Sequence, residues 1–149
     1  MSDYDSDYDQ FPLTIEEAKV RHEYYKSQHE EHIDLVTREV INKIKIKAEK
    51  WLSSFNLVDF ETEVVYNDHV NMMYEEVTQR VAKWGSSVKY MTITDSKREK
   101  VMDYDVRGNE SFRFISYVFK LKFSADALTE RHFIVIPENQ PEQKNDTSN

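Results

Sequence analysis

The sequence predicts an α+β fold, in which two N-terminal helices, a long one and a shorter one, are followed by a four-stranded antiparallel β-meander. Two observations predict this order. Residues 13–55 contain neither glycine nor proline and repeat apolar or aromatic side chains in steps of three and four, which is the spacing of one helix face. From Ser86 onward the period changes to two, which is the period of a β-strand.

The long helix has a recognisable start. Thr14 is a favourable N-cap residue, and Glu17 three residues later completes a capping box, so the helix should begin at Ile15. We place its end near Phe55, where serine and asparagine interrupt the pattern. Such a helix has ~40 residues and a length of about 60 Å. Because that exceeds the width of a compact domain of this size, the helix should bend or extend one end toward a partner.

The shorter helix is predicted to end at Gly85, a residue that suits the left-handed conformation found after many helices. Its start has two solutions. Asp59 is a suitable N-cap for a helix that begins near Phe60. Residues 57–66, however, are rich in β-branched and aromatic side chains, so a short strand there would delay the helix until Asp68. The sequence leaves this choice open.

The remaining chain predicts four strands, at residues 88–93, 102–106, 115–123 and 132–136. Phe112 and Phe114 lie on the opposite parity from the apolar run that follows them, which indicates a β-bulge near Phe114. The basic residues between the first two strands, Lys97, Arg98 and Lys100, are expected to occupy a loop.

Length and composition set the expected domain organisation. A chain of 149 residues suits one domain that buries roughly 70% of its unfolded surface. We expect residues 13–137 to form this single α+β domain. Residues 1–12 form an acidic tail whose carboxylates repel one another, and residues 138–149 form a polar tail. Both tails are expected to be disordered.

Residue usage excludes several classes of site. The chain has only two glycines and no cysteine, which removes glycine-rich phosphate loops, nucleophile elbows, disulfides and thiolate chemistry. Its N-terminus is acidic where a signal peptide is basic, and no apolar run approaches the roughly 18 residues of a membrane span. We therefore expect a soluble, intracellular, cytoplasmic protein without a membrane partner.

Charge argues against nucleic acid as a partner. The net charge of −8 repels phosphate over the whole surface, so a nucleic-acid site would need strong local focusing of positive charge. The basic run at residues 43–47 looks like such a patch, but acidic segments elsewhere in the chain are available to neutralise it. The expected partner is instead another protein with a basic surface.

The first residues of the chain repeat Ser-Asp-Tyr-Asp twice, and the candidate partner-binding residues within the repeat are Tyr4, Asp5, Tyr8 and Asp9. On a basic surface the carboxylates would pair with cations while the tyrosine rings stack. The alternative is a solvated tail that binds nothing.

A second candidate surface is a stripe near the start of the long helix, which we name the histidine stripe. It consists of Ile15, Ala18, His22, Tyr25, His29 and His32. The shorter helix does not extend far enough to cover it, so this face should lie on the sheet or meet another subunit, and we expect it to form a homodimer interface. In such a dimer, protonation of the three histidines below a pH of about 6.5 would weaken the association.

The histidine stripe also raises the question of a metal site. His29 and His32 are three residues apart on the predicted helix, and only His132 is placed to complete a site with them. Two histidines among acidic neighbours are a weak metal signature. We therefore expect neither a metal ion nor a cofactor.

A pocket between the helices and the sheet is the third candidate, and its predicted lining is Asp103, Arg113, Tyr117 and His132. Alternation along any solvent-facing strand places polar residues in this way. We therefore assign no catalytic residues.

These features favour a small acidic, non-catalytic interaction factor of the inhibitor, immunity or anti-defence type, which acts by binding a basic surface of a partner protein. One alternative is a protein that binds or sequesters a small molecule in the predicted pocket. A second alternative is a structural subunit of a larger assembly. The sequence does not separate the three.

Overall fold

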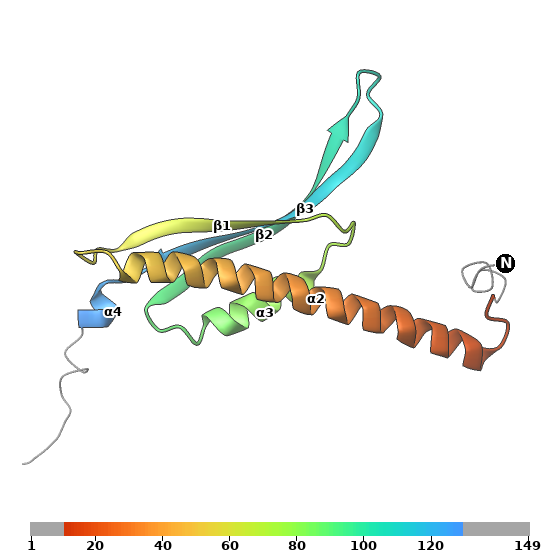
Figure 1. Cartoon of the computed structure of the whole chain (residues 1–149), viewed down its shortest axis with the longest axis horizontal. Coiled ribbons are helices and arrows are strands. Elements are labelled where there is room, and N and C mark those ends of the chain that lie inside the picture. The colour runs from red at the N-terminus through yellow and green to blue at the C-terminus, as the bar shows by residue number, and fades with distance from the viewer. Residues whose placement is uncertain (1–10, 130–149) are drawn as a thin grey trace, which may run out of the picture. The chain divides into compact units, whose positions relative to one another are not determined.

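The structure is a computed structural model that describes residues 11–129. Its elements are α2 (Ile15–Leu52), β1 (Phe60–Asp68), α3 (Glu75–Gly85), β2 (Met91–Tyr104), β3 (Glu110–Phe123) and α4 (Asp126–Thr129). Contacts divide the chain into two units with a boundary between Leu35 and Val36, inside α2. The first described unit is residues 11–35 and the second is residues 36–129, and Figure 1 shows their elements.

The α+β class is confirmed, but the predicted succession of two helices and a four-stranded meander is wrong. The described residues contain one antiparallel sheet of three strands in the order β1-β3-β2. A strand precedes α3, so the order along the chain is helix, strand, helix, two consecutive strands and a short helix. The predicted strand at residues 132–136, the predicted tail at residues 138–149 and residues 1–10 of the predicted tail at residues 1–12 lie outside the described residues.

The first error concerns residues 60–68, which form strand β1 instead of the start of a helix. Thr62, Val64 and Tyr66 alternate with exposed Glu61 and Glu63. This period of two buries one face and leaves the other in water, which β-branched and aromatic side chains favour. The strand interpretation of this stretch was the correct alternative. The helix that follows begins later than either predicted start.

The topology differs from a meander because β3 lies between the two strands that precede it. Strand β1 pairs with β3 from Phe60↔Phe123 to Asp68↔Ile115, and β2 pairs with the other edge of β3. Since both pairs are antiparallel, β1 and β2 run parallel to each other at the two edges of the sheet. Helix α3 is the crossover that such a parallel arrangement requires.

The second error concerns the predicted loop at Lys97, Arg98 and Lys100, which lies inside the continuous 14-residue strand β2. Polar residues occupy both parities there, a pattern that resembles a loop. Strand β2 is an edge strand paired only with β3 among the described residues, so water reaches polar side chains on both of its faces. Backbone pairing, for example Lys97↔Val118, carries the strand through the polar run.

The predicted bulge near Phe114 is confirmed. Val101 pairs with Phe114 and Met102 with Phe112, which leaves Arg113 as the extra residue on β3. A second bulge on β2 leaves Thr94 without a Cα partner, and its hydroxyl donates to the Lys120 carbonyl at 3.3 Å. Each bulge bends its strand and increases the local twist.

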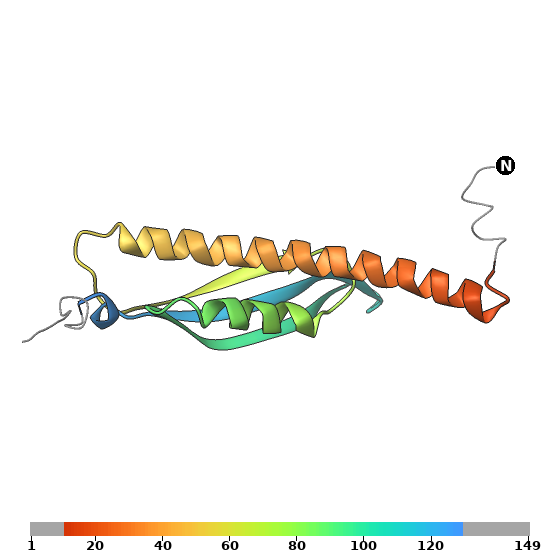
Figure 2. The same ribbon diagram turned by 90° about the horizontal axis from the view of Figure 1, so that it is seen from below.

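The core of the second unit lies on one face of the sheet. Val36, Val40 and Ile44 of α2 are fully buried, and their spacing of four keeps them on one side of the helix. Helix α3 adds Val77 and Val81 to the same core. Both α3 and residues 36–52 of α2 cover this face, as Figures 1 and 2 show.

Trp51 closes the end of the core near the last turn of α2. Its ring stacks on Phe123 at 5.1 Å between centroids and on Tyr90 at 6.0 Å. Its indole N–H donates to the Val58 carbonyl at 2.8 Å. Buried tryptophan therefore keeps a hydrogen-bond partner, and this bond ties the loop after α2 to the helix. The helix ends at Leu52, close to the predicted end.

Strands β2 and β3 extend as a two-stranded ribbon beyond the part of β3 that pairs with β1, and Figure 1 shows this ribbon rising from the sheet. At its tip the carboxylate of Asp105 accepts the N–H groups of Arg107 and Asn109 at 2.8 and 2.9 Å. The backbone hydrogen bond from Asn109 lowers the pKa of Asp105; desolvation raises it by less, and the hydrogen bond from Arg107 lowers it further. Gly108 has a φ of 84°, which other residues adopt with strain.

Candidate functional site

The predicted start of the long helix is confirmed. The Glu17 N–H donates to the Thr14 hydroxyl oxygen at 3.1 Å. In return, the Glu17 carboxylate accepts the N–H groups of Leu13 at 2.9 Å and Thr14 at 3.1 Å. These bonds form a capping box. The bond from Leu13, followed by that from Thr14, lowers the pKa of Glu17, because each stabilises the charged form.

The first unit, residues 11–35, is a cap followed by helix, and it exposes large apolar side chains. Val20 is 71% exposed and Tyr24 is 58% exposed. The two residues are four apart, so their side chains are neighbours on one helix face. The Tyr24 ring also meets the ring of Tyr25 edge to face at 5.7 Å. A helical surface of this kind is apolar at its centre and open to solvent.

Acidic residues surround Val20 and Tyr24 on the same side of the helix. At 100° per residue, the arc between about 60° and 200° from Ile15 contains the two apolar side chains and several carboxylates. We name this arc the acidic face. Its residues are Glu16, Glu17, Val20, Glu23, Tyr24, Ser27, Glu30, Glu31, Asp34 and Leu35. The basic residues Lys19, Arg21 and Lys26 lie outside the arc.

The histidine stripe lies on the other side of the same helix. All six predicted residues belong to α2, and Ile15 and Tyr25 are exposed. His29 and His32 are partly buried and each takes part in an interaction. The steps along the stripe are three, four, three, four and three, which is the spacing of a coiled-coil seam. The structure contains one copy of the chain, so the dimer stays a prediction.

Three of the four predicted pocket residues belong to the described part of the chain, and the structure places them in two environments. Asp103 and Arg113 meet across the ribbon, with 3.4 Å between the carboxylate and the guanidinium nitrogen, and both are more than half exposed. Tyr117 is fully buried in the core of the sheet. His132 lies outside the described residues. The pair and the tyrosine therefore belong to different environments.

The exposed Arg113 belongs to a small cluster at the base of the ribbon. Its guanidinium carbon lies 5.2 Å from the centre of the Phe114 ring, a cation–π distance. His69 meets the same ring edge to face at 6.0 Å, and its Nδ1 lies 3.4 Å from the Arg113 carbonyl oxygen. Arg113 is the extra residue of the bulge, and its guanidinium lies beside the ring of the next residue, Phe114. The cluster fixes the ribbon against the loop after β1.

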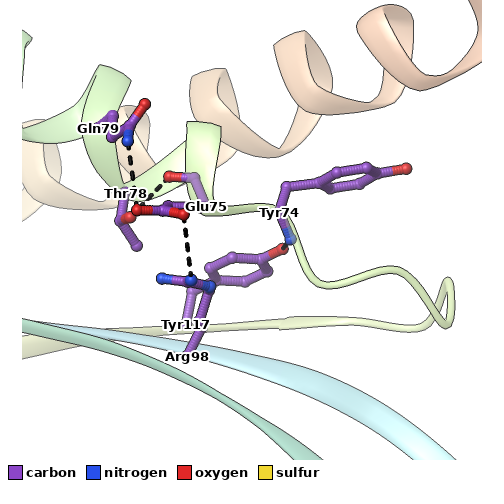
Figure 3. Close-up of polar contacts among 6 residues, drawn as sticks. All are labelled: Tyr74, Glu75, Thr78, Gln79, Arg98 and Tyr117. Carbon is purple, nitrogen blue, oxygen red and sulfur yellow. Dashed lines mark hydrogen bonds and ion pairs between the residues drawn. The ribbon is translucent and has the colours of Figure 1, made fainter. Parts of the chain in front are cut away.

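The buried Tyr117 anchors the start of α3, as Figure 3 shows. Its hydroxyl oxygen accepts the N–H of Tyr74 at 3.1 Å. Burial raises the pKa of Tyr117 and of Tyr74, because a charged phenolate loses its hydration in the core. Both rings therefore stay neutral at neutral pH. The sequence pattern identified Tyr117 as polar and inward-facing, but its role is structural.

Arg98, which the sequence placed in a loop, lies next to this anchor. Its guanidinium reaches Glu75 at 3.9 Å, and its Nε is buried with no hydrogen-bond partner. Glu75 also receives a hydrogen bond from Gln79 at 3.4 Å, and its carbonyl accepts the Thr78 hydroxyl at 2.7 Å. Figure 3 shows these contacts. They hold the first turn of α3 above strand β2.

A depression of about 530 Å³ lies between α3 and β2, and we name it the α3–β2 groove. Its lining residues are Ala82, Gly85, Ser86, Met91, Thr92, Ile93, Thr94, Asp95 and Ser96. Apolar and hydroxyl groups share this lining, and Asp95 is its only charged residue. The sequence did not predict the groove, because it depends on α3 and β2 being packed together.

The predicted partner-binding residues of the acidic repeat, Tyr4, Asp5, Tyr8 and Asp9, lie outside the described residues. Within residues 11–129, no three metal-binding side chains form a cluster. No helix in that range has the length and apolar character needed to cross a membrane. A scan against protein-family models and searches of curated proteins and of solved structures gave no match to the chain.

Proposed function

We propose that this protein is a small acidic, non-catalytic interaction factor that binds a basic surface of a partner protein through the acidic face of α2. Inhibitors, immunity factors and anti-defence factors act in this way. The acidic repeat at Tyr4, Asp5, Tyr8 and Asp9 would extend the same contact. No part of the proposal requires a cofactor.

The observation that carries the proposal is that Val20 and Tyr24 are exposed on a helix face whose other residues are mostly acidic. An exposed apolar centre with a charged rim has the composition of a protein interface. Complete burial of one such side chain contributes about 1.5–3 kcal/mol. The surrounding glutamates add attraction to a basic partner, which chiefly increases the association rate and selects the partner.

A photo-crosslinking experiment tests this proposal. A benzoylphenylalanine at position 24 would be compared with one at position 104, because Tyr104 is 65% exposed but lies on the ribbon. After irradiation in extract of the source cells, mass spectrometry would identify the crosslinked proteins. We expect one basic-surfaced protein at position 24 and not at position 104. E16K/E23K should abolish that product, since it reverses the rim charge.

Two results would contradict the proposal. One is a crosslinking pattern shared by positions 24 and 104, which would indicate nonspecific adhesion. The other is a position-24 product that persists unchanged in E16K/E23K and at 1 M salt, where the Debye length is about 3 Å. Either result removes the acidic face as the binding surface.

The histidine stripe supports a second proposal, a homodimer, because its coiled-coil spacing places an apolar and aromatic seam opposite the acidic face. Light scattering at pH 7 should give the mass of a dimer, and A18E/Y25E should give the mass of a monomer. V20E/Y24E changes two side chains on the other face and should leave the dimer intact. A monomeric unmodified protein at pH 7 would exclude this dimer.

A further inference from the structure

The α3–β2 groove runs beside a sheet edge that has no partner within residues 11–129. Strand β2 pairs with β3 on one side only. An edge strand presents backbone donors and acceptors that can pair with an added strand. The first question is therefore which backbone groups of β2 point away from β3 next to the groove.

The hydrogen bond from the Ser124 N–H to the Tyr90 carbonyl, at 2.9 Å, answers this question. It makes Tyr90 and Ser124 a hydrogen-bonded pair. Bonded and non-bonded pairs alternate along an antiparallel ladder, and Ile93 pairs with Leu121 before the bulge. Counting from Tyr90 makes Ile93 a non-bonded position. Its N–H and carbonyl therefore point toward the free edge, in the middle of the groove lining.

The groove has room for side chains beside this edge. Helix α3 contributes only small residues to the lining, and the closest to the strand is Gly85. A Cβ at Gly85 would lie 2.6 Å from Cδ1 of Ile93, so the missing side chain lets Ile93 lie against the last turn of the helix. The volume of about 530 Å³ falls within the range of ligand sites.

Charge distinguishes this edge of the sheet from the other. Between Thr78 and Lys100 the chain has six basic and two acidic residues, although the whole chain has a net charge of −8. Lys89 places its ammonium 3.4 Å from the carbonyl of Ser86, which lines the groove. Lys97 directly follows the lining on β2. The only lining carboxylate, Asp95, lies opposite Lys120 across the β2–β3 pair.

The opposite edge has the reverse charge. Strand β1 and the residue before it contain Asp59, Glu61, Glu63 and Asp68 and no basic residue. An acidic segment that added to β1 would meet like charges, whereas at β2 it would meet lysines. Like charges placed side by side oppose association, and unlike charges select the partner.

We propose that the α3–β2 groove binds an extended acidic segment of another protein by strand addition. The backbone of that segment pairs with the free edge of β2 around Ile93, and alternate side chains enter the groove beside α3. The side chains between them point to the opposite face of the sheet, where their carboxylates meet Lys97, which lies between Asp95 and Glu99 on β2. This site is separate from the acidic face of α2, and neither proposal depends on the other.

Fluorescence anisotropy with full-length protein tests the proposal. The probe is a fluorescein-labelled eight-residue peptide that alternates aspartate and valine, and the control peptide has lysine in place of every aspartate. We expect the acidic peptide to bind and the basic peptide not to bind. A82F fills the groove from an exposed helix position and should weaken binding by about tenfold or more, and K97E should do the same.

The matched control is K45E, which makes the same charge reversal at an exposed position on α2 and should leave the affinity unchanged. Amide NMR should show that the added peptide slows hydrogen exchange at Ile93. Circular dichroism checks that each variant is folded, and K97E supplies the test if A82F is not.

Three outcomes would overturn the proposal. In the first, the acidic peptide does not bind. In the second, it binds K97E and K45E equally well. In the third, the protein amide signals that shift when the peptide is added belong to β1 or to residues 15–31. In each case the lysines of β2 would serve only to protect the edge from unwanted pairing, a role that charged side chains play on many edge strands.

Discussion

Helix α2 contains two regions that share one secondary structure and differ in almost everything else. From Val36 to Trp51 the apolar side chains of one face recur mostly in steps of four and are buried, with Val40 and Ile44 fully inaccessible, whereas Ile46 on the other face is exposed. In residues 15–25 the side chains of Ile15 and Val20 are both 71% exposed. The helical pattern continues through both regions without a glycine or proline.

The difference shows that helical periodicity specifies a helix but does not specify what the helix buries. Residues 36–52 belong to the unit that contains the sheet, and their apolar face forms part of its core. Apart from Ile33, which is buried, residues 15–35 have no fully buried side chain. They depend more on local interactions, such as the capping box at Thr14 and Glu17, because most helical stability otherwise comes from packing. The acidic face and the histidine stripe both lie in the region that tertiary packing constrains least.

The largest expected contrast between the two regions comes from a matched truncation of isoleucine. I44A removes a fully buried side chain and should reduce the free energy of unfolding by about 2–5 kcal/mol. I15A removes the same atoms from an exposed position and should change it by less than about 0.5 kcal/mol. Urea denaturation followed by circular dichroism measures both. Equal losses would mean that residues 15–35 are buried in solution, for example in a dimer.

A tyrosine pair gives the next largest contrast. Y117F removes the hydroxyl oxygen that accepts the Tyr74 N–H at 3.1 Å, so a buried donor loses this acceptor at a cost of about 1–3 kcal/mol. Y24F removes a hydroxyl that is open to solvent and should have no measurable effect on stability. The same urea titration applies to both variants. A neutral Y117F would show that the start of α3 does not depend on this bond.

Gly108 at the tip of the ribbon shows that an exposed position does not always tolerate substitution. Gly108 has space around it, with nothing within 4 Å of an added Cβ, yet its φ of 84° is unfavourable for other residues. G108A should therefore cost roughly 1 kcal/mol through the backbone alone. V106A, at a fully exposed neighbouring position, should be neutral. If both variants were neutral, the tip would have to adopt another conformation without loss of stability.

Local signals in the sequence predicted local features of the fold correctly. Thr14 and Glu17 marked the start of α2, and the parity change at Phe114 marked a bulge. Helix α3 ends at Gly85 as predicted, but Gly85 is its last helical residue and does not adopt the left-handed conformation on which that prediction was based. The helix predicted from Asp59 was wrong, because a spacing of three to four among valines also fits part of a strand. Only pairing with β3, which is distant in sequence, decides between the two.

The candidate surfaces also divide into those that depend on local sequence and those that depend on packing between distant segments. The histidine stripe was predictable because six positions on one helix need only the helical period. The pocket assigned to Asp103, Arg113, Tyr117 and His132 stays a prediction, because His132 lies outside the described residues. Of the other three, Asp103 and Arg113 are exposed on the ribbon and Tyr117 is buried in the core. The α3–β2 groove was missed because its two sides come from elements whose packing no local pattern encodes.

The smallest expected effect concerns pH and the cap of α2. The pKa of Glu17 is lowered by the hydrogen bond from the Leu13 N–H and then by that from Thr14. A lowered pKa means that the cap stabilises the helix above the pKa of the unfolded chain, and that this contribution disappears as the pH falls through the folded-state pKa. The loss should therefore begin below the ordinary glutamate value and affect residues 13–18 first.

Amide NMR of the full chain between pH 6 and pH 3 measures this loss as a shift of the Leu13 and Thr14 N–H signals. In E17Q the side chain still accepts these hydrogen bonds but carries no charge, so the two signals should become nearly independent of pH. The buried half of α2 serves as an internal reference, because the amides of Val40 and Ile44 should not follow the same titration. If they did, the two regions of the helix would unfold together, and the local stability inferred for residues 15–35 would be wrong.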